Sequence, residues 1–349
     1  MIPDVSIIVP ARNEARRIRA CLEALLAQDY PAYEVVVVDD QSSDATVEQV
    51  LAIQARDPRV TLVHAGTLPD GWVGKSHALA VGTRVARGGW YLFVDADTHL
   101  APHSLSTVLA RAQAHGVDCL SLSPEQACEG FWERTVQPVV FEFLSARFDF
   151  EAVNDPGRPE AAANGQFILI RRAVYDRIGG HDAIKGIVLE DVALANRVKR
   201  GGYRLSFQDG RGLARSRMYE SLPDLWQGWT KILFLLCGSR LTTVCAAACR
   251  AGLHALPLVL LPVAVRVGWT GSGPVTATIV GITLLLVAVV YARAWSTLRR
   301  LGFPSAISTL MYPLGCAIFV GMLAASATTG VITRRVSWRG RTYGISPSD

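Results

Sequence analysis

Short hydrophobic runs alternate with amphipathic stretches through the first third of the chain. The runs predict strands, and the stretches between them predict helices because their apolar residues recur at helical spacing. The predicted strands are VSIIVP (5–10), EVVVVDD (34–40), RVTLVH (59–64) and WYLFVDAD (90–97), and the predicted helices cover about residues 14–28, 44–56 and 75–87. This alternation predicts an α/β fold with a mostly parallel sheet covered by helices on both faces.

The pattern becomes less regular between about residues 130 and 212. This region holds a polar loop, VNDPGRPEAAANGQ (153–166), and then an apolar strand, FILIRR (167–172). A helix is predicted to begin near Leu189.

After Leu222 the chain becomes largely apolar. The stretch LPDLWQGWTKILFLL (222–236) mixes tryptophans, one lysine and an apolar run, which is typical of a helix lying in the membrane interface. Three further segments are apolar enough to be membrane spans: the short helix between Arg250 and Arg266, residues 275–291, and residues 306–332.

The charges around these segments conflict with a simple three-span topology. The predicted loop RAWSTLRR (293–300) and the tail RRVSWRGR (334–341) are both strongly basic, so both should lie in the cytoplasm. A single span between them cannot satisfy this. Either the last segment is re-entrant or the tail breaks the rule.

Composition agrees with contact between the chain and a membrane. Half of the 349 residues are hydrophobic, and the net charge of +5 comes largely from arginines near the apolar segments. This favours an anionic membrane surface over nucleic acid as a partner, because no basic stripe with interleaved aromatics is present. The seven cysteines form no CxxC pair, which favours reduced thiols over a disulfide or zinc framework.

We therefore expect four parts in the chain. Residues 1–221 form an α/β domain, which should lie in the cytoplasm because no signal-like run precedes its first strand. Residues 222–240 form an interfacial amphipathic helix. Residues 241–333 form about three transmembrane helices, and residues 334–349 form a basic tail.

Acidic residues gather where the predicted strands end. The segment from Pro10 to Glu14 follows the first strand, Asp39 and Asp40 end the second, and Asp95 and Asp97 end the fourth. Any one set is also typical of a turn or a helix cap. Since ligands of such sheets bind at the carboxyl ends of the strands, the three sets together indicate a site. Carboxylates at i and i+2 of a strand point to one side, where they repel each other unless a cation or a proton lies between them.

Five motifs, in this order, resemble family 2 of the inverting glycosyltransferases, which have the GT-A fold. They are VPARNEA (9–15), VVVDDQSSD (36–44), GWVGKSHAL (71–79), FVDADTHL (93–100) and VLEDVALA (188–195), and the resemblance covers about residues 3–235. The GWVGK, NGQFILIRR, LED and final WRGRTY segments resemble a membrane-bound branch. That branch includes ceramide glucosyltransferases and the hopanoid- and carotenoid-associated glycosyltransferases.

The resemblance implies a donor site and a metal site. Asp95-Ala96-Asp97 corresponds to the family's DxD motif, with Asp97 as a ligand of Mg²⁺ or Mn²⁺ and Asp95 orienting the ribose or the metal's ligands. Asp39 and Asp40 resemble the acids that hold the uracil and ribose of a UDP-sugar. The remaining residues implied in sugar-nucleotide binding are Pro10, Ala11, Arg12, Glu14 and Ala96.

Two nearby side chains have alternative roles. Lys75 follows a glycine at a predicted helix start, so it either reaches the diphosphate or is a solvated helix lysine. His99 lies in phase with the two acids and is either a third metal ligand or a polar residue at the start of a loop, since the family does not require it.

Glu190-Asp191 resembles the family's ED motif, in which the aspartate is the general base. Asp191 would deprotonate an acceptor hydroxyl for in-line attack, with inversion at the anomeric carbon, and Glu190 would orient the acceptor or cap the helix. Asn164, Gly165 and Gln166 would shape the sugar and acceptor pocket.

The chain departs from the family at one motif. Many membrane-bound relatives have QxxRW, whereas this chain has QGWTK (227–231). Processive synthesis is therefore less favoured than the addition of one sugar. Trp229 would line the acceptor mouth or belong to an interfacial aromatic belt.

The predicted function is metal-dependent transfer of one hexose from a UDP-sugar to a membrane lipid of sphingolipid, isoprenoid or hopanoid, or carotenoid type. The alternatives are a processive polysaccharide synthase and a non-catalytic membrane scaffold that binds sugar nucleotides. A sugar nucleotidyltransferase would need a glycine-rich loop near the N-terminus, and VPARNEA is not one.

Overall fold

The computed structural model describes residues 3–303, 305–333, 335–338 and 341–344. The chain divides into two compact units, which are described separately. The sheet unit runs to Ala127 and also contains Phe148–Met218. The helical unit contains Cys128–Arg147 and the chain from Tyr219 onward. The sequence alone had placed residues 128–147 in the first domain, together with the sheet.

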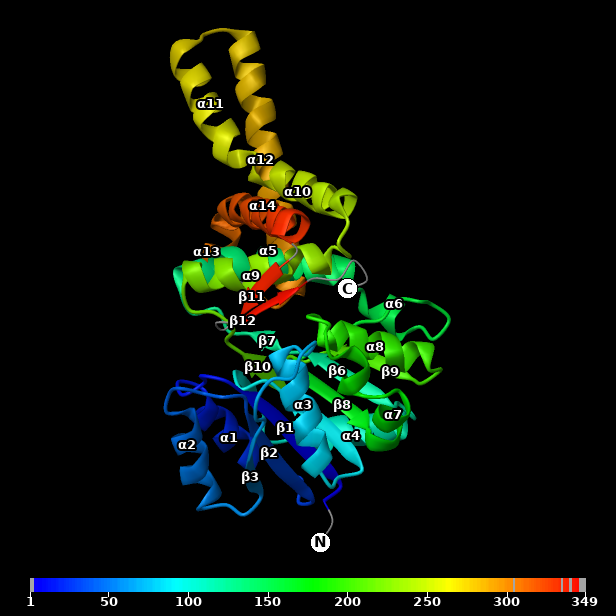
Figure 1. Ribbon diagram of the computed structural model, residues 1–349. Helices are drawn as coiled ribbons and strands as arrows, with labels where there is room; N and C mark the ends of the chain where they lie inside the picture. The colour runs from blue at the N-terminus through cyan, green and yellow to red at the C-terminus, as the bar shows by residue number, and fades with distance from the viewer. Residues whose placement is uncertain (1–2, 304, 334, 339–340, 345–349) are drawn as a thin grey trace. The chain divides into compact units, whose positions relative to one another are not determined.

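Within the described residues, seven strands form the main sheet in the order β3-β2-β1-β4-β8-β6-β9 (Figure 1). Their bounds are β1 (Val5–Ala11), β2 (Tyr33–Asp39), β3 (Val60–His64), β4 (Trp90–Val94), β6 (Cys119–Ser123), β8 (Phe167–Arg171) and β9 (Leu205–Asp209). Strand β8 runs antiparallel to both of its neighbours, and all other neighbouring strands are parallel. The predicted mostly parallel sheet is confirmed.

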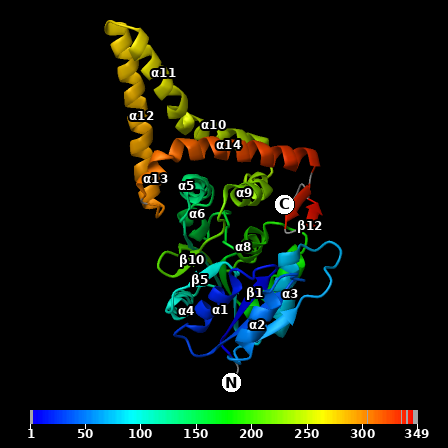
Figure 2. The same cartoon turned by 90° about the vertical axis from the view of Figure 1, so that its left-hand side faces the viewer.

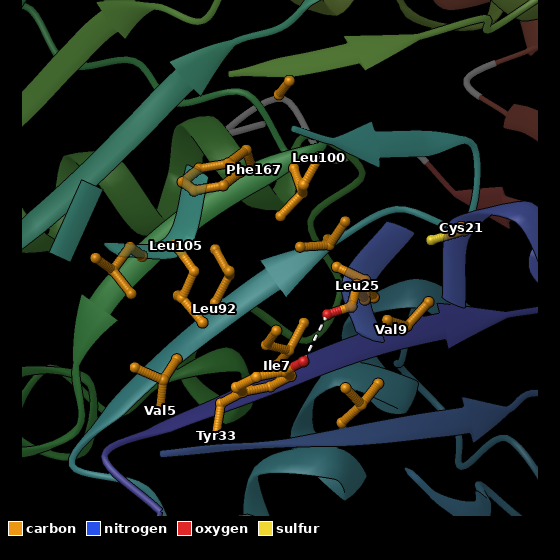
Figure 3. Close-up of a cluster of buried hydrophobic side chains, with 14 of the residues drawn as sticks. Val5, Ile7, Val9, Cys21, Leu25, Tyr33, Leu92, Leu100, Leu105 and Phe167 are labelled. Carbon is orange, nitrogen blue, oxygen red and sulfur yellow. Dashed lines mark hydrogen bonds between the residues drawn. The ribbon is translucent and has the colours of Figure 1, made fainter. Parts of the chain in front are cut away.

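Helices cover both faces of this sheet, because successive strand residues point to opposite faces. Ile7 packs into a cluster with α1 (Ile18–Leu26), α2 (Thr46–Gln54) and α4 (Ser104–Ala114). Ile8 packs into another with α3 (Gly74–Val85), α7 (Arg172–Arg177) and α8 (Glu190–Arg200). Figure 3 shows the first cluster, in which the Tyr33 hydroxyl donates a hydrogen bond to the carbonyl of Leu25 at 3.0 Å.

A smaller sheet borders the main one in the same unit. Its strands are β5 (Thr98–Leu100), β7 (Glu125–Gln126) and β10 (Ala214–Ser216), in the order β5-β10-β7. Ser216 is paired with Thr98 on one side and with Gln126 on the other. One row of this sheet therefore contains three polar side chains. The unit is completed by α6 (Phe150–Asn154) and a 3₁₀ turn, η1 (His181–Ile184).

The fourth strand is shorter than predicted. It ends at Val94, and the backbone N–H of Thr98 donates to the carbonyl of Asp95 at 3.0 Å, which closes a turn. Asp95 and Asp97 therefore lie on this turn rather than on the strand. The argument from strand alternation was wrong in that respect, although both acids do lie at the sheet edge.

The helical unit contains most of the apolar sequence. Its elements are α5 (Phe131–Arg147), α9 (Leu222–Leu236), α10 (Leu241–Ala255), α11 (Pro257–Thr270), α12 (Pro274–Arg300), α13 (Ala306–Leu310), α14 (Tyr312–Thr328), the π-helical turn η2 (Thr329–Thr333), β11 (Arg335–Trp338) and β12 (Arg341–Gly344). Helix α14 packs against α5, α9 and α10, and α11 pairs with α12 (Figure 2).

Among the described residues, three helical segments are long and apolar enough to cross a membrane: Leu241–Thr270, Pro274–Arg300 and Tyr312–Thr333. They indicate membrane association, as predicted. The detail differs in two places. The segment 293–300 is the end of α12 and not a loop, and the apolar stretch between Arg250 and Arg266 is split between α10 and α11. The basic tail is described only in part, as the hairpin of β11 and β12, and residues 334, 339–340 and 345–349 lie outside the described residues.

Candidate active site

The candidate residues meet at one edge of the main sheet. Pro10 and Ala11 end β1, Asp39 ends β2, and Asp95 directly follows β4. Because β8 is antiparallel to β4, with Phe167 opposite Val94, the segment just before β8 reaches the same edge. The prediction from strand ends therefore extends to residues 164–166, whose place depends on the reversed direction of β8.

Lys75 lies at the centre of an acidic cluster. Its Nζ atom is 2.8 Å and 2.9 Å from the two carboxylate oxygens of Asp95, and 2.9 Å from Oε1 of Glu190. The Lys75 side chain is only 15% exposed, so the alternative of a solvated helix lysine is wrong. Burial alone would lower the pKa of Lys75, but the charges of Asp95 and Glu190 outweigh it and raise the pKa. The lysine stays charged and bridges the turn after β4 to the start of α8.

This cluster contains more acidic side chains than basic ones, since Lys75 is its one cation among the described residues. Burial raises the pKa of Asp95 to about 7, with Lys75 opposing the shift and Asp97 adding to it. Burial and the charge of Glu190 likewise raise the pKa of Asp191 to about 6. The pKa of Glu190 is lowered because Lys75 offsets the cost of its burial. One lysine among four carboxyl groups leaves the site short of positive charge.

Glu190 and Asp191 occupy the first turn of α8, as predicted. Asp191 accepts hydrogen bonds from the backbone N–H groups of Gly165 at 3.0 Å and Val192 at 2.8 Å. These bonds and the positive end of the helix dipole favour its ionised form and oppose the effect of burial. The carboxylate is thereby held in one orientation, as a general base requires.

Asp97 is held by one of its two oxygens. The hydroxyl groups of Ser216 and Thr98 each donate to Oδ1 at 3.2 Å, and the amide of Gln166 lies at 3.5 Å from the same atom. The amide of Gln166 also donates to the Ser216 hydroxyl at 2.6 Å, and the amide of Gln126 lies 3.4 Å from Oε1 of Gln166. Among the described residues, no hydrogen bond reaches Oδ2 of Asp97.

Sequence reasoning missed Ser216, Thr98 and Gln126 as parts of the site. They contact Asp97, directly or through Gln166, because the strands of the small sheet pair in one register, and no sequence motif marks that pairing. His99 is the next residue of β5 after Thr98, so its side chain lies on the opposite face of that strand from the Thr98 side chain, which binds Asp97. This geometry favours the non-ligand alternative for His99.

The turn after β4 fits a divalent cation. Hard carboxylate oxygens are the ligands that Mg²⁺ and Mn²⁺ prefer, and Asp97 presents one oxygen oriented from behind by three donors. Among the described residues, no group of three or more His, Cys, Asp or Glu side chains is close enough to enclose a metal ion.

Gly165 packs directly against the side chain of Lys75. A Cβ atom at this position would lie 2.8 Å from Nζ of Lys75, 3.2 Å from Glu190 and 3.5 Å from Asp191. Asn164 and Gln166 flank it, and the Asn164 side chain accepts from the N–H of Gln166 at 3.0 Å, which fixes the loop. Of the four residues predicted to contact the acceptor, Gly165 lies beside both candidate catalytic acids.

The acids after β2 form a second, separate group. Asp39 accepts from the N–H of Ser42 at 3.1 Å, and its other oxygen lies 3.2 Å from Nδ1 of His64. Arg12 donates to the carbonyl of Asp40 at 2.7 Å, and its guanidinium lies 3.9 Å from the Asp40 carboxylate. His64 was not singled out from the sequence, although it ends the neighbouring strand β3.

The loops after β1 and β2 lock together beside these acids. Asn13 adopts a φ of 55°, accepts from the N–H of Ser43 at 2.8 Å, and donates its own N–H to the hydroxyl of Ser42 at 3.0 Å. The N–H of Glu14 donates to the hydroxyl of Thr46 at 2.8 Å. Asparagine tolerates this left-handed backbone better than most residues, so the two loops can cross at close range.

Trp229 belongs to the helical unit and is described there. Its side chain is 2% exposed, and its indole N–H donates to Oε1 of Gln137 on α5 at 2.8 Å. Phe141 and Tyr219 pack edge-on against its ring. The residue thus joins α9 to α5.

Comparison with known proteins gives a consistent result. Residues 3–221 match the family described as glycosyltransferase like family 2. The chain is 28% identical, over 98% of its length and 88% of the relative's, to a 4,4'-diaponeurosporenoate glycosyltransferase of Staphylococcus aureus strain MRSA252. It is 31% identical to the protein of that name from strain USA300, over 66% of this chain and 60% of the relative.

A solved structure shares the fold. It is a mannosyltransferase from Pyrobaculum calidifontis in complex with GDP-Man and Mn²⁺, with a TM-score of 0.57 and 21% identity, covering 96% of this chain and 88% of that one. The predicted GT-A fold is confirmed. From the family match over the sheet unit and the named relatives, this chain is a glycosyltransferase and belongs to glycosyltransferase family 2.

Proposed function

We propose that the protein is an inverting, divalent-metal-dependent transferase that moves one hexose from a UDP-sugar to the polar end of a membrane lipid. The observation that supports this most is the cluster around Lys75. In it, Lys75 pairs with Asp95 and with Glu190, and the next residue after Glu190 is the candidate base Asp191, which accepts from the N–H of Gly165. The inverting outcome, the metal and the UDP donor are parts of this proposal.

The donor end of the site is built for a diphosphate. Asp97 and Asp95 would hold Mg²⁺ or Mn²⁺, which stabilises the negative charge that develops on the leaving diphosphate. Lys75 supplies a second positive charge at the same place, where it now neutralises Asp95 and Glu190. Asp39 and Asp40, with Pro10, Ala11, Arg12, Glu14 and Ala96 nearby on the same edge, are assigned to the nucleoside.

The acceptor end is assigned to Asp191. As the acceptor oxygen bonds to the anomeric carbon, the bond from that carbon to the diphosphate breaks, and the hydroxyl proton passes to the Asp191 carboxylate. Glu190 stays paired with Lys75 and so keeps the first turn of α8 in place. A single displacement with one base inverts the anomeric carbon.

The acceptor is assigned to a membrane lipid with a hydroxyl or a carboxylate at its end. Apolar helical segments such as Pro274–Arg300 support a lipid substrate, since they would hold the enzyme at the bilayer. The curated relatives are named for 4,4'-diaponeurosporenoate, which is a carboxylate, so a carotenoid-type acid is the first acceptor to test. Gly165 lies where the acceptor would approach the base, and Asn164 and Gln166, which flank it, remain proposed acceptor-site residues. The buried Trp229 is assigned to the packing of α9 on α5.

The test is release of the nucleoside diphosphate from a panel of UDP-sugars and GDP-mannose, with Mg²⁺, Mn²⁺ or EDTA, and with lipid fractions that include carotenoid acids. Mass spectrometry of the lipids then identifies the product, and NMR gives its anomeric configuration. One added hexose of inverted configuration, formed from a UDP-sugar only when metal is present, is the expected result.

Other outcomes would replace parts of the proposal. Turnover with GDP-mannose alone would overturn the assignment of Asp39 and Asp40 to uridine. Products with several hexoses would indicate processive synthesis, and donor binding without any transfer to any lipid would indicate a scaffold.

A further inference from the structure

The last apolar segment, Tyr312–Thr333, has the composition of a membrane span, but it packs against protein helices where a span would contact lipid. Helix α14 is apolar on all sides, and such helices are either spans or helices buried in a protein core. In its most apolar window 44% of the residues are buried, against 11% in α12. The burial comes from α5 and α9 along one side and from α10.

Contacts with α5 follow the first half of α14. The Tyr312 hydroxyl donates to the carboxylate of Glu142, and the rings of Phe319 and Phe143 lie 5.5 Å apart. Gly315 lies directly against the backbone carbonyl of Thr135, where any side chain would collide with it. The two helices are therefore in close backbone contact.

Contacts with α9 follow the second half. The Ser326 hydroxyl accepts from the backbone N–H of Phe234 at 2.8 Å, and Gly330 in the turn after α14 lies against the Phe234 ring. A Cβ atom on Gly321 would lie 3.3 Å from the ring of Trp226. The segment is thus attached along its whole length to α5 and α9.

Both supporting helices are too charged for the hydrocarbon core of a bilayer. Helix α5 carries Glu133, Arg134, Glu142 and Arg147, and α9 carries Asp224 and Lys231. Charged side chains in the middle of a bilayer are costly and rare. If α5 and α9 lie outside the hydrocarbon, then α14, which is packed along them, lies outside it as well.

The hairpin of α11 and α12, unlike α14, leaves most of its apolar side chains unburied. Its apolar side chains face outward, with Val259, Val265 and Leu285 each more than 60% exposed. No charged residue occurs between Val267 and Ala292, so its tip can enter hydrocarbon at little cost. Within the helical unit, α14 runs across the direction of α12 (Figure 2). A bilayer crossed by the hairpin would therefore not be crossed by α14.

We propose that only the α11–α12 hairpin crosses the hydrocarbon core, and that α14 is a core helix of the helical unit outside it. Helix α11, with 14 residues, would span about 21 Å, and the apolar stretch 275–291 would span about 25 Å, so both are short for a bilayer. Arg266 lies near the far end of α11, where its side chain can extend to the membrane surface. The basic end of α12 and the basic tail then lie on the same side as the sheet unit. This resolves the topological conflict in the sequence, because both segments satisfy the positive-inside rule.

The test is the accessibility of single cysteines to a membrane-impermeant maleimide, in sealed vesicles of both orientations that contain the full chain. The exposed cysteines Cys245 and Cys249 and the half-buried Cys128 are first changed to serine. Three variants are then compared: Glu48→Cys in the sheet unit, Ser272→Cys at the hairpin tip, and Gly344→Cys at the end of β12. All three positions are exposed, and no atom lies within 4 Å of where the Gly344 Cβ would be.

Labelling of positions 48 and 344 from one side, and of position 272 from the other, is the expected result. Labelling of position 344 from the side opposite to 48 would overturn the proposal, because three spans place the C-terminal hairpin across the membrane. Labelling of position 272 from the same side as 48 would also overturn it, because the hairpin would then not cross. UDP-sugar turnover in the same vesicles checks that each variant is folded.

Discussion

Two groups of acids lie along one edge of the main sheet, and they differ in the number of partners that neutralise or hydrogen-bond their carboxylates. Asp39 and Asp40 are bound by their own surroundings, namely the N–H of Ser42, the ring of His64 and the guanidinium of Arg12. Near Lys75 there are four acids, and that one cation forms ion pairs with two of them, Asp95 and Glu190.

This difference suggests two roles: the first group binds the donor's nucleoside, and the second takes part in the reaction. Asp39 is hydrogen-bonded by Ser42 and contacts His64, and Asp40 faces the guanidinium of Arg12, so this group can offer a fixed shape to a nucleoside. In a group with more acids than bases, the carboxylates repel one another, and a metal ion that binds with the donor removes this repulsion. Burial is the main cause of the raised pKa values of Asp95 and Asp191, and the neighbouring acids Asp97 and Glu190 add to it. Variants in the two groups should therefore fail in different ways.

The largest effect is expected from Asp97→Asn. Loss of the charge that holds the metal should lower kcat/KM by about 10³-fold, since a bound metal is worth several kcal/mol of transition-state stabilisation. Mn²⁺ affinity, measured by electron paramagnetic resonance, should fall with it.

Asp39→Asn is the matched control for Asp97→Asn. It should weaken UDP binding, measured by calorimetry, while Mn²⁺ dependence stays as in the parent. Equal loss of metal dependence in both variants would contradict the separation of the two groups.

Asp191→Asn should leave UDP-sugar binding intact and lower kcat by about 10²-fold or more with a hydroxyl acceptor, because the base is lost. A carboxylate acceptor is already ionised at neutral pH, so its loss should be less than about tenfold. The ratio of the two losses, from single-turnover measurements, identifies the acceptor class. Full activity with both acceptors would show that Asp191 is not the base.

The pH profile should show the state of Asp191 directly. Its pKa is raised to about 6 by burial and by Glu190, so the fraction in the basic form falls as the pH drops below 6. With a hydroxyl acceptor, kcat/KM should fall about tenfold per pH unit below that point. If kcat/KM of the Asp191→Asn variant falls in the same way below pH 6, the fall is due to another titrating group.

The smallest effect is expected from Ser216→Ala, which removes one donor to Asp97 without touching a charge. Outer-shell partners of metal ligands are typically worth about 10–100-fold in metal affinity, and the lower end is expected because Thr98 and Gln166 remain. Ser104→Ala is the matched control, because Ser104 is equally buried and donates to the carbonyl of Leu213. Both variants should lose similar thermal stability, and only Ser216→Ala should lose Mn²⁺ affinity. Unchanged Mn²⁺ affinity in Ser216→Ala would rule out its positioning role.

The sequence by itself determined the order of strands and helices and the edge at which the site lies. Strand ends can be located from hydrophobic pattern, and ends of parallel strands meet at one edge, so Asp39, Asp40, Asp95 and Asp97 could be placed together. The position of Asp191 in a first helical turn was likewise a local property. The apolar segments after residue 240 were visible from composition alone.

Only the tertiary structure decided which groups touch. Lys75 meets Glu190 across a long stretch of chain, and Ser216 meets Asp97 because three short strands pair in one register. Composition also could not tell a span from a core helix in α14, since both are apolar on all sides and only their neighbours differ. Local sequence fixes which side of an element is apolar and where the element ends, whereas long-range pairing depends on the packing of the whole fold.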